Sequence, residues 1–237
     1  MENKNSTEKP RKKIRKILWR VAMSLIVILL LFHIVWINSG SNQWELVRDE
    51  NEIKIWTLKT PGTKLIKVKA KFQIESTLAG IVKSVEDTTS YADAGMTEDV
   101  ILIDPISAPG YYSVYTVYKL PMPSPLNRRE LVALLTRYQN PKTKKIEINV
   151  IAAPNKTEPD DCCIRVLHMH NNYVLTPLEN GKVDIEFRHE FDIGGSMPYF
   201  VKNAMSPEFL FTMMSDFKKL LSMDKYKKAK LNFIKEL

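Results

Sequence analysis

The stretch that decides the fold reads Asp-Ile-Gly-Gly-Ser-Met-Pro and spans residues 192–198. Its adjacent glycines, Gly194 and Gly195, allow backbone angles that a side chain would forbid. Pro198 has a fixed φ that suits the first turn of a helix. An alternating pattern precedes the stretch and an amphipathic pattern follows it, so we predict a sharp turn from a strand into a long C-terminal helix. A helix laid across a curved sheet can enclose an apolar cavity.

The chain upstream of this turn reads as a series of strands linked by hairpins. Residues 64–75 are the clearest strand, because apolar residues alternate there with lysines and a glutamine. A short helix or turn is expected over 43–52, with Trp44 and Val47 in the core, and a second helix from a Ser76 cap to about Glu86. Further strands are predicted at 52–59, 98–104, 111–120, 131–138, 144–151, 161–170 and 183–191. Antiparallel hairpins with separate helices indicate the α+β class.

The region after the turn is predicted to be helical in two pieces, Tyr199–Met205 and a longer piece from Pro207 onward. Residues 223–237 are expected to be its lysine-rich end. Lysines near the C-terminus of a helix interact favourably with the helix dipole. The alternative role for these lysines is contact with anionic lipid headgroups.

Charge and hydropathy divide the chain into regions. The net charge of the 237-residue chain is +8, but the excess sits in residues 1–20 and 218–237, so we do not expect nucleic-acid binding. Residues 1–16 form a basic leader, and 17–37 form an apolar segment long enough to cross a bilayer, with Trp19 and Trp36 near its ends. The positive-inside rule predicts a single-pass anchor with a cytoplasmic N-terminus and an extracytoplasmic domain. A cleaved signal peptide, which would leave a secreted or periplasmic domain, is one alternative; an anchored domain facing the cytoplasm is another.

Side chains that could support catalysis or metal binding are few. Cys162 and Cys163 are not expected to form a disulfide, because neighbours in sequence strain the bridge. His168 and His170 alternate on a predicted strand, a spacing that can bind a metal, and one cysteine could join them. We interpret both histidines as solvent-facing residues. With no nucleophile elbow, phosphate loop or HExxH motif, no metal, cofactor or catalytic residue is expected, and the protein is not expected to be an enzyme.

Four signals in order along the chain carry a resemblance to a known family. They are 44–49 (Trp-Glu-Leu-Val-Arg-Asp) leading into 53–56, Pro125 followed by 129–132 (Arg-Glu-Leu-Val), 164–166 (Ile-Arg-Val), and 192–198. Over residues 43–222 the chain resembles the START (StAR-related lipid-transfer) family of the SRPBCC superfamily, as a membrane-anchored member of bacterial type. It departs from the family pattern at Glu130 (usually Asp), at Ile193 (usually Pro), and in 91–97, which lacks a common tryptophan.

The resemblance implies a helix-grip fold, in which a curved antiparallel sheet wraps around the C-terminal helix and one hydrophobic molecule binds between them. The expected ligand is a lipid or sterol-like molecule, bound by a monomer for transfer or sensing at the membrane. The cavity-lining candidates are Val183, Ile185, Phe187, His189, Phe191, Leu210, Met213, Met214 and Phe217. The structural motif comprises Trp44, Arg129, Glu130, Arg165, Asp192, Gly194, Gly195 and Pro198.

Roles within these two sets are expected to differ. His189 would be a lone polar group that orients a ligand head among apolar neighbours. Arg129, Glu130 and Arg165 are expected to make a strand-edge ion pair that fixes a loop, with ligand contact as the alternative. Two other functions stay open: an enzyme of the same fold that uses the cavity as its active site, and a ligand-gated envelope scaffold.

Overall fold

The computed structural model describes residues 8–89 and 100–237. The chain divides into two compact units. The helical unit comprises Met1–Gln43 and Lys59–Lys64, and the sheet unit comprises Trp44–Leu58 and Leu65–Leu237. The 91–97 segment, where the family tryptophan is missing, lies outside the described residues.

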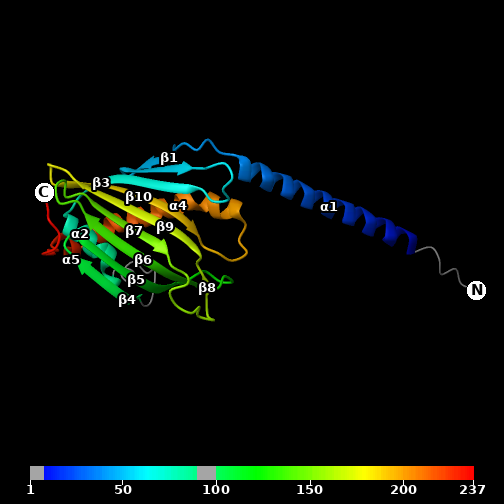
Figure 1. Cartoon of the computed structure of the whole chain (residues 1–237). Coiled ribbons are helices and arrows are strands. Elements are labelled where there is room, and N and C mark those ends of the chain that lie inside the picture. Colours follow the sequence, from blue (N-terminus) through cyan, green and yellow to red (C-terminus); the bar gives the residue numbers. More distant parts are fainter. Residues whose placement is uncertain (1–7, 90–99) are drawn as a thin grey trace, which may run out of the picture. The chain divides into compact units, whose positions relative to one another are not determined.

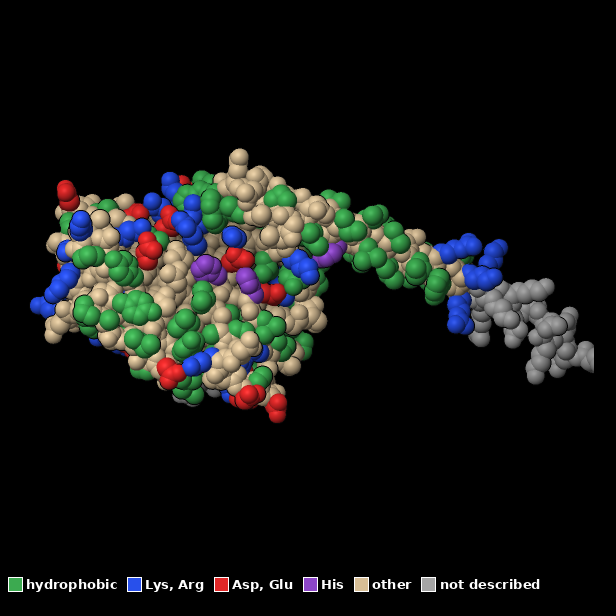
Figure 2. All heavy atoms as spheres, viewed as in Figure 1, with side chains coloured by type: hydrophobic (Ala, Val, Ile, Leu, Met, Phe, Trp, Pro, Cys, Tyr) green, Lys and Arg blue, Asp and Glu red, His purple; other side chains and the backbone are tan. Residues whose placement is uncertain are grey.

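The helical unit is built on one long helix, α1 (Glu8–Asn38). Within it, Lys13–Asn38 has a mean hydropathy of 2.4 and is long and apolar enough, by length and composition, to cross a membrane. Figure 2 shows hydrophobic side chains along α1 and basic side chains towards its N-terminal end. Because α1 begins at Glu8, the helix includes much of the basic leader as well as the apolar segment.

The backbone carbonyl groups at the C-terminal end of α1 accept hydrogen bonds from the 59–64 turn, chiefly from a lysine. The ammonium of Lys59 donates to the carbonyl oxygens of Ile37 at 3.2 Å and Ser39 at 3.3 Å. The Gly62 N–H donates to the Ile37 carbonyl at 2.8 Å. These bonds pair carbonyls that a helix end leaves without intrahelical partners, and a cation favours that end of the helix dipole. Burial lowers the pKa of Lys59 below its usual range.

The sheet unit contains, in its described part, a ten-stranded sheet that curves around a long helix (Figure 1). Neighbouring strands along the main path pair antiparallel, and one short strand, β8 (Ile164–Arg165), pairs parallel with β6. The order along the path is β1 (Glu45–Glu50), β2 (Ile53–Leu58), β3 (Lys67–Glu75), β10 (Lys182–Asp192), β9 (His168–Pro177), β7 (Ile146–Ala152), β6 (Arg129–Gln139), β5 (Tyr111–Leu120) and β4 (Val100–Ala108).

In the part of the sheet unit that the structure describes, the sheet is accompanied by α2 (Leu78–Glu86), α4 (Tyr199–Leu221) and α5 (Asp224–Lys227). The hydroxyl of Thr77 caps α2 by accepting from the Gly80 N–H at 3.0 Å, so the cap is one residue later than predicted. The core draws on β3, β10, α2 and α4, including Phe72, Phe187, Ile81 and Leu210. The α+β class and the helix-grip arrangement predicted from sequence are therefore confirmed.

Two predictions about strands were wrong. Residues 45–50 form β1 rather than a helix or turn, because pairing with β2 satisfies their backbone. Val47 is exposed, and Trp44 is half-buried with the Lys69 ammonium 4.6 Å from its ring centroid. The strand predicted at 161–170 is instead a loop with the two-residue β8, followed by β9 from His168 to Pro177.

The C-terminal region also differs from prediction. Helix α4 runs without a break through Pro207, so the two predicted pieces are one helix. It ends at Leu221, and residues 223–237 form α5 and an irregular segment rather than a helix end. Burial of Tyr226 and Ile234 explains the departure, since these side chains join the core only if the chain leaves the helix axis.

Candidate ligand cavity

The turn from β10 into α4 has the backbone that the sequence predicts. Gly194 and Gly195 have φ values of +70° and +68°, a region that L-residues rarely occupy. Asp192 closes the turn: one carboxylate oxygen accepts from the Gly194 N–H at 2.9 Å and from Lys202 Nζ at 2.5 Å. The other oxygen accepts from the Tyr199 hydroxyl at 3.2 Å. Burial raises the pKa of Asp192, but these hydrogen bonds and the charge of Lys202 outweigh it and lower the pKa below its usual range.

Arg129 contacts the backbone of this turn. Its side chain is buried, and its Nε donates to the Ile193 carbonyl at 2.6 Å. Its Nη1 donates to the Asn127 carbonyl. A Cβ added at Gly195 would lie 3.1 Å from Arg129 Nη2. Gly195 is therefore required both for its positive φ and for the close approach of a guanidinium.

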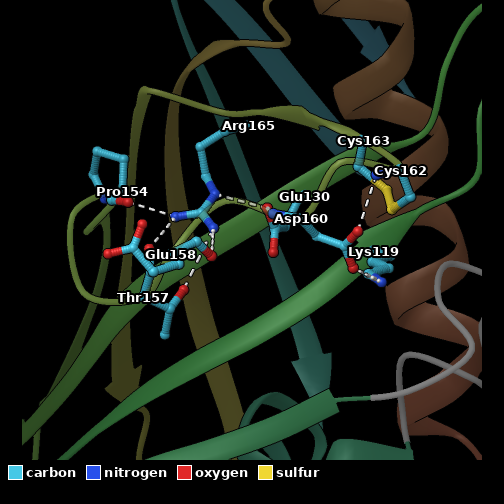
Figure 3. Close-up of polar contacts among 9 residues, drawn as sticks. All are labelled: Lys119, Glu130, Pro154, Thr157, Glu158, Asp160, Cys162, Cys163 and Arg165. Atoms are coloured by element: carbon cyan, nitrogen blue, oxygen red, sulfur yellow. Dashed lines mark hydrogen bonds and ion pairs between the residues drawn. A yellow bond between two sulfur atoms is a disulfide. The ribbon is translucent and has the colours of Figure 1, made fainter.

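Glu130 and Arg165 form the buried ion pair expected at this strand edge, while Arg129 takes no part in it. Arg165 Nε lies 2.8 Å from Glu130 Oε2, which also accepts from the Asp160 N–H at 3.1 Å. Arg165 further donates to the carbonyls of Thr157 at 3.1 Å and Glu158 at 2.8 Å (Figure 3). The pair thus fastens the loop that precedes β8.

The same loop carries a disulfide between Cys162 and Cys163 (Figure 3). The prediction that these neighbours stay unbridged was wrong. It rested on the strain that a bridge between sequence neighbours puts on the intervening peptide, whereas the structure bridges the two residues within a loop. The Cys162 N–H donates to an Asp160 carboxylate oxygen at 2.9 Å, and the other Asp160 oxygen lies 2.5 Å from Lys119 Nζ.

A cavity of about 290 Å³ lies in the sheet unit, lined by α2, β5, β6, β7, β9, β10 and α4. Six of the nine cavity-lining candidates line it: Phe187, His189, Phe191, Met213, Met214 and Phe217. The other three candidates, Val183, Ile185 and Leu210, are buried in the core instead. Val183 and Ile185 oppose Ile74 and Phe72 of β3 near the start of β10, whereas the β10 residues that line the cavity come later in the strand, from Phe187 onward.

His189 is a buried polar residue in this lining, with 7% of its surface exposed. Its Nδ1 lies 2.8 Å from Oδ1 of Asn171, the residue directly opposite it in the β9–β10 ladder. A carboxamide oxygen only accepts, so Nδ1 carries the proton and Nε2 has a free lone pair. The rings of Phe187, Phe191 and Phe209 lie 5.5–6.0 Å away, centroid to centroid. Burial lowers the pKa of His189 to about 4, so the ring is neutral at pH 7.

The comparisons with known proteins concern this same architecture. No family model matches the chain. A Pseudomonas aeruginosa protein described as uncharacterized is 23% identical over 168 residues, which is 70% of this chain and 81% of that protein. Among solved structures, a STAR-related lipid transfer protein from Xanthomonas axonopodis matches with a TM-score of 0.67 and 19% identity, over 76% of this chain and 99% of its own.

Two human structures match in the same way. STARD10 has a TM-score of 0.68 and 16% identity, over 81% of this chain and 77% of its own. StAR-related lipid transfer protein 5 has a TM-score of 0.63 and 13% identity, over 87% of this chain and 97% of its own. The chain has the START fold. The resemblance inferred from four short motifs is thus confirmed at the level of the fold.

Within the START fold, sequence reasoning missed the part of the cavity wall contributed by β5, β6, β7, β9 and α2. Asn171 and Tyr173 of β9 and Ser84 of α2 are among these residues. Asn171 was missed because the predicted strand ended at residue 170, one residue before it. Alternation from His168 through the correct strand would have placed Asn171 on the opposite face from the two surface histidines.

The surface histidines lie outside the START cavity. His168 is half exposed, and its Nε2 lies 2.9 Å from Glu190. His170 is exposed, so both have the solvent-facing position expected of them. Within residues 8–89 and 100–237, no group of three or more His, Cys, Asp or Glu side chains could hold a metal ion.

Proposed function

We propose that this protein binds one hydrophobic molecule in the cavity between its sheet and α4. The observation that carries the proposal is a cavity lined mostly by apolar side chains, with His189 and Asn171 as polar groups among them. Apolar pockets with a few placed polar groups are typical of small-molecule sites. The lipid-transfer names of the matched structures with the same fold add support.

Burial of apolar surface would supply the binding energy. Each square ångström of apolar surface removed from water contributes roughly 25 cal/mol. Phe217, Met213 and Met214 supply much of the α4 side of the wall, and methionine adapts to irregular apolar shapes. We infer that α4 acts as the cover, moving about the Gly194–Gly195 turn to admit the ligand.

We further propose that α1 anchors the protein in a membrane, with its N-terminus in the cytoplasm and the sheet unit on the other side. The length and hydropathy of Lys13–Asn38 support the anchor, and the basic residues before it support the orientation. An anchored binding domain suits lipid sensing or transfer close to its own membrane. We infer that the protein acts there as a monomer.

Binding without catalysis is the simpler function for this cavity. Among the described residues that line it, the ionisable side chains are His189, Asp216, Tyr118 and Tyr173. The hydrogen bond that His189 makes is to an amide, which neither activates a nucleophile nor relays a proton. We therefore infer a carrier or sensor rather than an enzyme.

Methionine methyl NMR of the full chain in lipid nanodiscs tests the proposal. Met169, Met213 and Met214 line the cavity, whereas Met205 and Met223 are exposed. We expect lipid extracted from the host membrane to shift the three cavity methyls and to leave the two exposed ones in place. Equal shifts at all five would indicate general partitioning, and no shift at the cavity methyls would contradict ligand binding.

A matched pair of α4 variants sharpens this test. Met213→Trp fills the cavity, whereas Met205→Trp adds the same side chain to an exposed position of the same helix. We expect Met213→Trp to abolish lipid-induced shifts at Met169 and Met205→Trp to preserve them. Loss of binding in both variants, or in neither, would count against the cavity as the site.

A further inference from the structure

The disulfide in the loop before β8 contributes little as a staple of the fold. Cys162 and Cys163 are neighbours in sequence, so their bridge closes almost no loop in the unfolded chain. The stabilisation that a disulfide gives by restricting the unfolded chain falls as the closed loop shortens. Global stability therefore does not account for this bridge.

The bridge is open to attack by a thiol. Cys162 is exposed and Cys163 is half-buried, and both lie in a loop. Thiol–disulfide exchange requires access to one of the two sulfur atoms, and exposed disulfides are more readily reduced than buried structural ones. The Sγ of Cys162 is thus the atom that an incoming thiolate reaches.

The residue that follows the bridge packs against the turn into α4. A Cβ added at Gly194 would lie 3.3 Å from Cγ2 of Ile164, and a Cβ added at Gly195 would lie 3.4 Å from its Cδ1. The N–H of Ile164 donates to the Arg128 carbonyl at 2.9 Å. Ile164 therefore connects the bridged pair directly to both glycines of the turn.

The bridge restricts the segment that holds Ile164 in place. A bond between two neighbouring side chains encloses the peptide between them in one small ring, so Cys162 and Cys163 have few conformations. The Cys162 N–H also donates to the Asp160 carboxylate at 2.9 Å (Figure 3), and the Cys163 N–H donates to the Asp160 carbonyl at 3.2 Å. Opening the bridge returns conformational freedom to both cysteines and holds Ile164 less firmly against the glycines.

We propose that Cys162–Cys163 is a redox-modification site that a dithiol reduces, and that reduction loosens the Gly194–Gly195 turn. One thiolate of the dithiol attacks Cys162 Sγ, the bond to Cys163 breaks, and Cys163 leaves as a thiolate that takes up a proton. The second thiolate of the dithiol then attacks the donor sulfur of the mixed disulfide and releases Cys162, which is protonated in turn. The protein gains two electrons and two protons, and the dithiol becomes a disulfide.

Faster exchange of the ligand is the expected consequence of a looser turn. This consequence rests on the proposed function, in which α4 moves about Gly194–Gly195 to admit the ligand. The orientation proposed for α1 puts the loop outside the cytoplasm, where disulfides persist. The bridged form is then the resting state, and reduction requires a supplied dithiol.

Thiol counting on the full-length protein in nanodiscs tests the site itself. The protein is incubated without denaturant with dithiothreitol or with reduced thioredoxin, alkylated with iodoacetamide and weighed intact by mass spectrometry. We expect both cysteines of the chain to become alkylated, and re-oxidation before alkylation to prevent it. Faster reduction by thioredoxin would indicate a protein donor, and faster reduction by dithiothreitol a small-molecule donor. No alkylation with either reagent would overturn the proposal.

Hydrogen exchange at the Gly194 amide tests the link to the turn. This N–H donates to Asp192, and we expect its exchange to become about fivefold faster on reduction. The Gly181 amide, in another turn with a positive φ, should exchange at an unchanged rate. The double variant Cys162→Ser/Cys163→Ser should exchange like the reduced protein and not respond to dithiol. Equal acceleration at both glycines, or none at Gly194, would overturn the link.

Two truncations show whether Ile164 carries the effect. Ile164→Ala removes the contact with the glycines, so Gly194 should exchange fast in the bridged form and reduction should add little. Leu167→Ala shortens a nearby side chain that is 71% exposed, and it should keep the fivefold response. A full response in Ile164→Ala would contradict the role of this contact.

Failure of this proposal and failure of the proposed function are distinguishable. With host lipid extract present, the line shapes of the Met213 and Met214 methyls report ligand exchange, which we expect to be faster in the reduced protein. Shifted methyls with an unchanged exchange rate would overturn the effect of reduction on the cavity. Absence of any shift at these methyls would overturn the proposed function, and the results for the thiols and for Gly194 would stand.

Discussion

The carboxylate of Asp192, the last residue of β10, lies 2.5 Å from the ammonium of Lys202 near the start of α4. This ion pair spans the Gly194–Gly195 turn and joins the sheet directly to the helix that covers it. The Lys202 side chain is 6% exposed, so Asp192 supplies the opposite charge that a buried ammonium needs. The pair therefore holds the first turns of α4 in place while the glycines supply the change of direction.

Breaking this ion pair on one side should destabilise the sheet unit. Asp192→Asn leaves a buried ammonium without its carboxylate, and we expect a loss of roughly 3 kcal/mol in the free energy of unfolding. Thermal and urea unfolding of the full chain in detergent measure it. The double variant Asp192→Asn/Lys202→Met should recover part of the loss. Asp224→Asn, which breaks an exposed pair with Lys228, should cost less than about 1 kcal/mol, and an equal cost at both sites would contradict the role of Asp192.

Gly195 should tolerate alanine less well than a glycine with the same φ in open space. Gly181 has a φ of +74° and nothing within 4 Å of an added Cβ, whereas at Gly195 the Cβ meets Arg129 at 3.1 Å. Gly181→Ala should therefore cost only the left-handed backbone, about 1–2 kcal/mol, and Gly195→Ala should cost more. Gly195→Val should be worse still, because of its branched side chain. Equal melting temperatures for the two alanine variants would show that Arg129 moves aside freely.

Burial of neutral His189 should make stability depend on pH. Its pKa falls from 6.5 to about 4 on folding, so between these values the unfolded chain binds a proton that the folded chain does not. Stability is then lost as pH decreases through this window, by about 3 kcal/mol in total for this group. Urea unfolding between pH 4 and 7 should show a smaller slope for His189→Phe than for the unmodified protein. His168→Phe should keep the original slope, and an unchanged slope in His189→Phe would argue against the neutral ring.

The C-terminal segment should stabilise α2 through Glu236. Its carboxylate oxygens accept from the N–H groups of Leu78 and Ala79, each at 2.9 Å, at a helix end where an anion is favourable. Glu236→Ala should cost about 1 kcal/mol, the usual value of a helix cap, measured as a lower melting temperature of the full chain. Glu179→Ala, at an exposed turn position, should leave it unchanged; if both variants melt alike, Glu236 adds nothing.

Much of the fold was predictable because its signals are local. The alternation of β3, the glycine pair before α4 and the apolar stripe of α4 each depend on residues close in sequence. The predictions were wrong where contacts between segments distant in sequence determine the local structure. Residues 45–50 become a strand because β2 lies beside them, and the chain after Leu221 turns so that Tyr226 and Ile234 join the core.

The candidate site, like the fold, was predictable only where its signals are local in sequence. His189 could be identified from sequence as a polar residue on an apolar strand face. Its partner could not, because the pairing of His189 with Asn171 depends on the register between β9 and β10. A shift of one residue in that register would place the side chains of the moved strand on the other face of the sheet. The Cys162–Cys163 bridge was likewise not predicted, because a bridge between neighbours in sequence is expected to be strained.

The sequence by itself determined the apolar N-terminal segment, the α+β class and the turn at Gly194–Gly195, because backbone sterics and hydrophobic periodicity act over a few residues. Tertiary structure alone decided which of the predicted apolar residues line the cavity and which fill the core. Val183 and Phe187 lie on the same face of β10, yet only Phe187 borders the cavity. That difference comes from what packs opposite each residue, and such packing exists only once the sheet, α2 and α4 have come together.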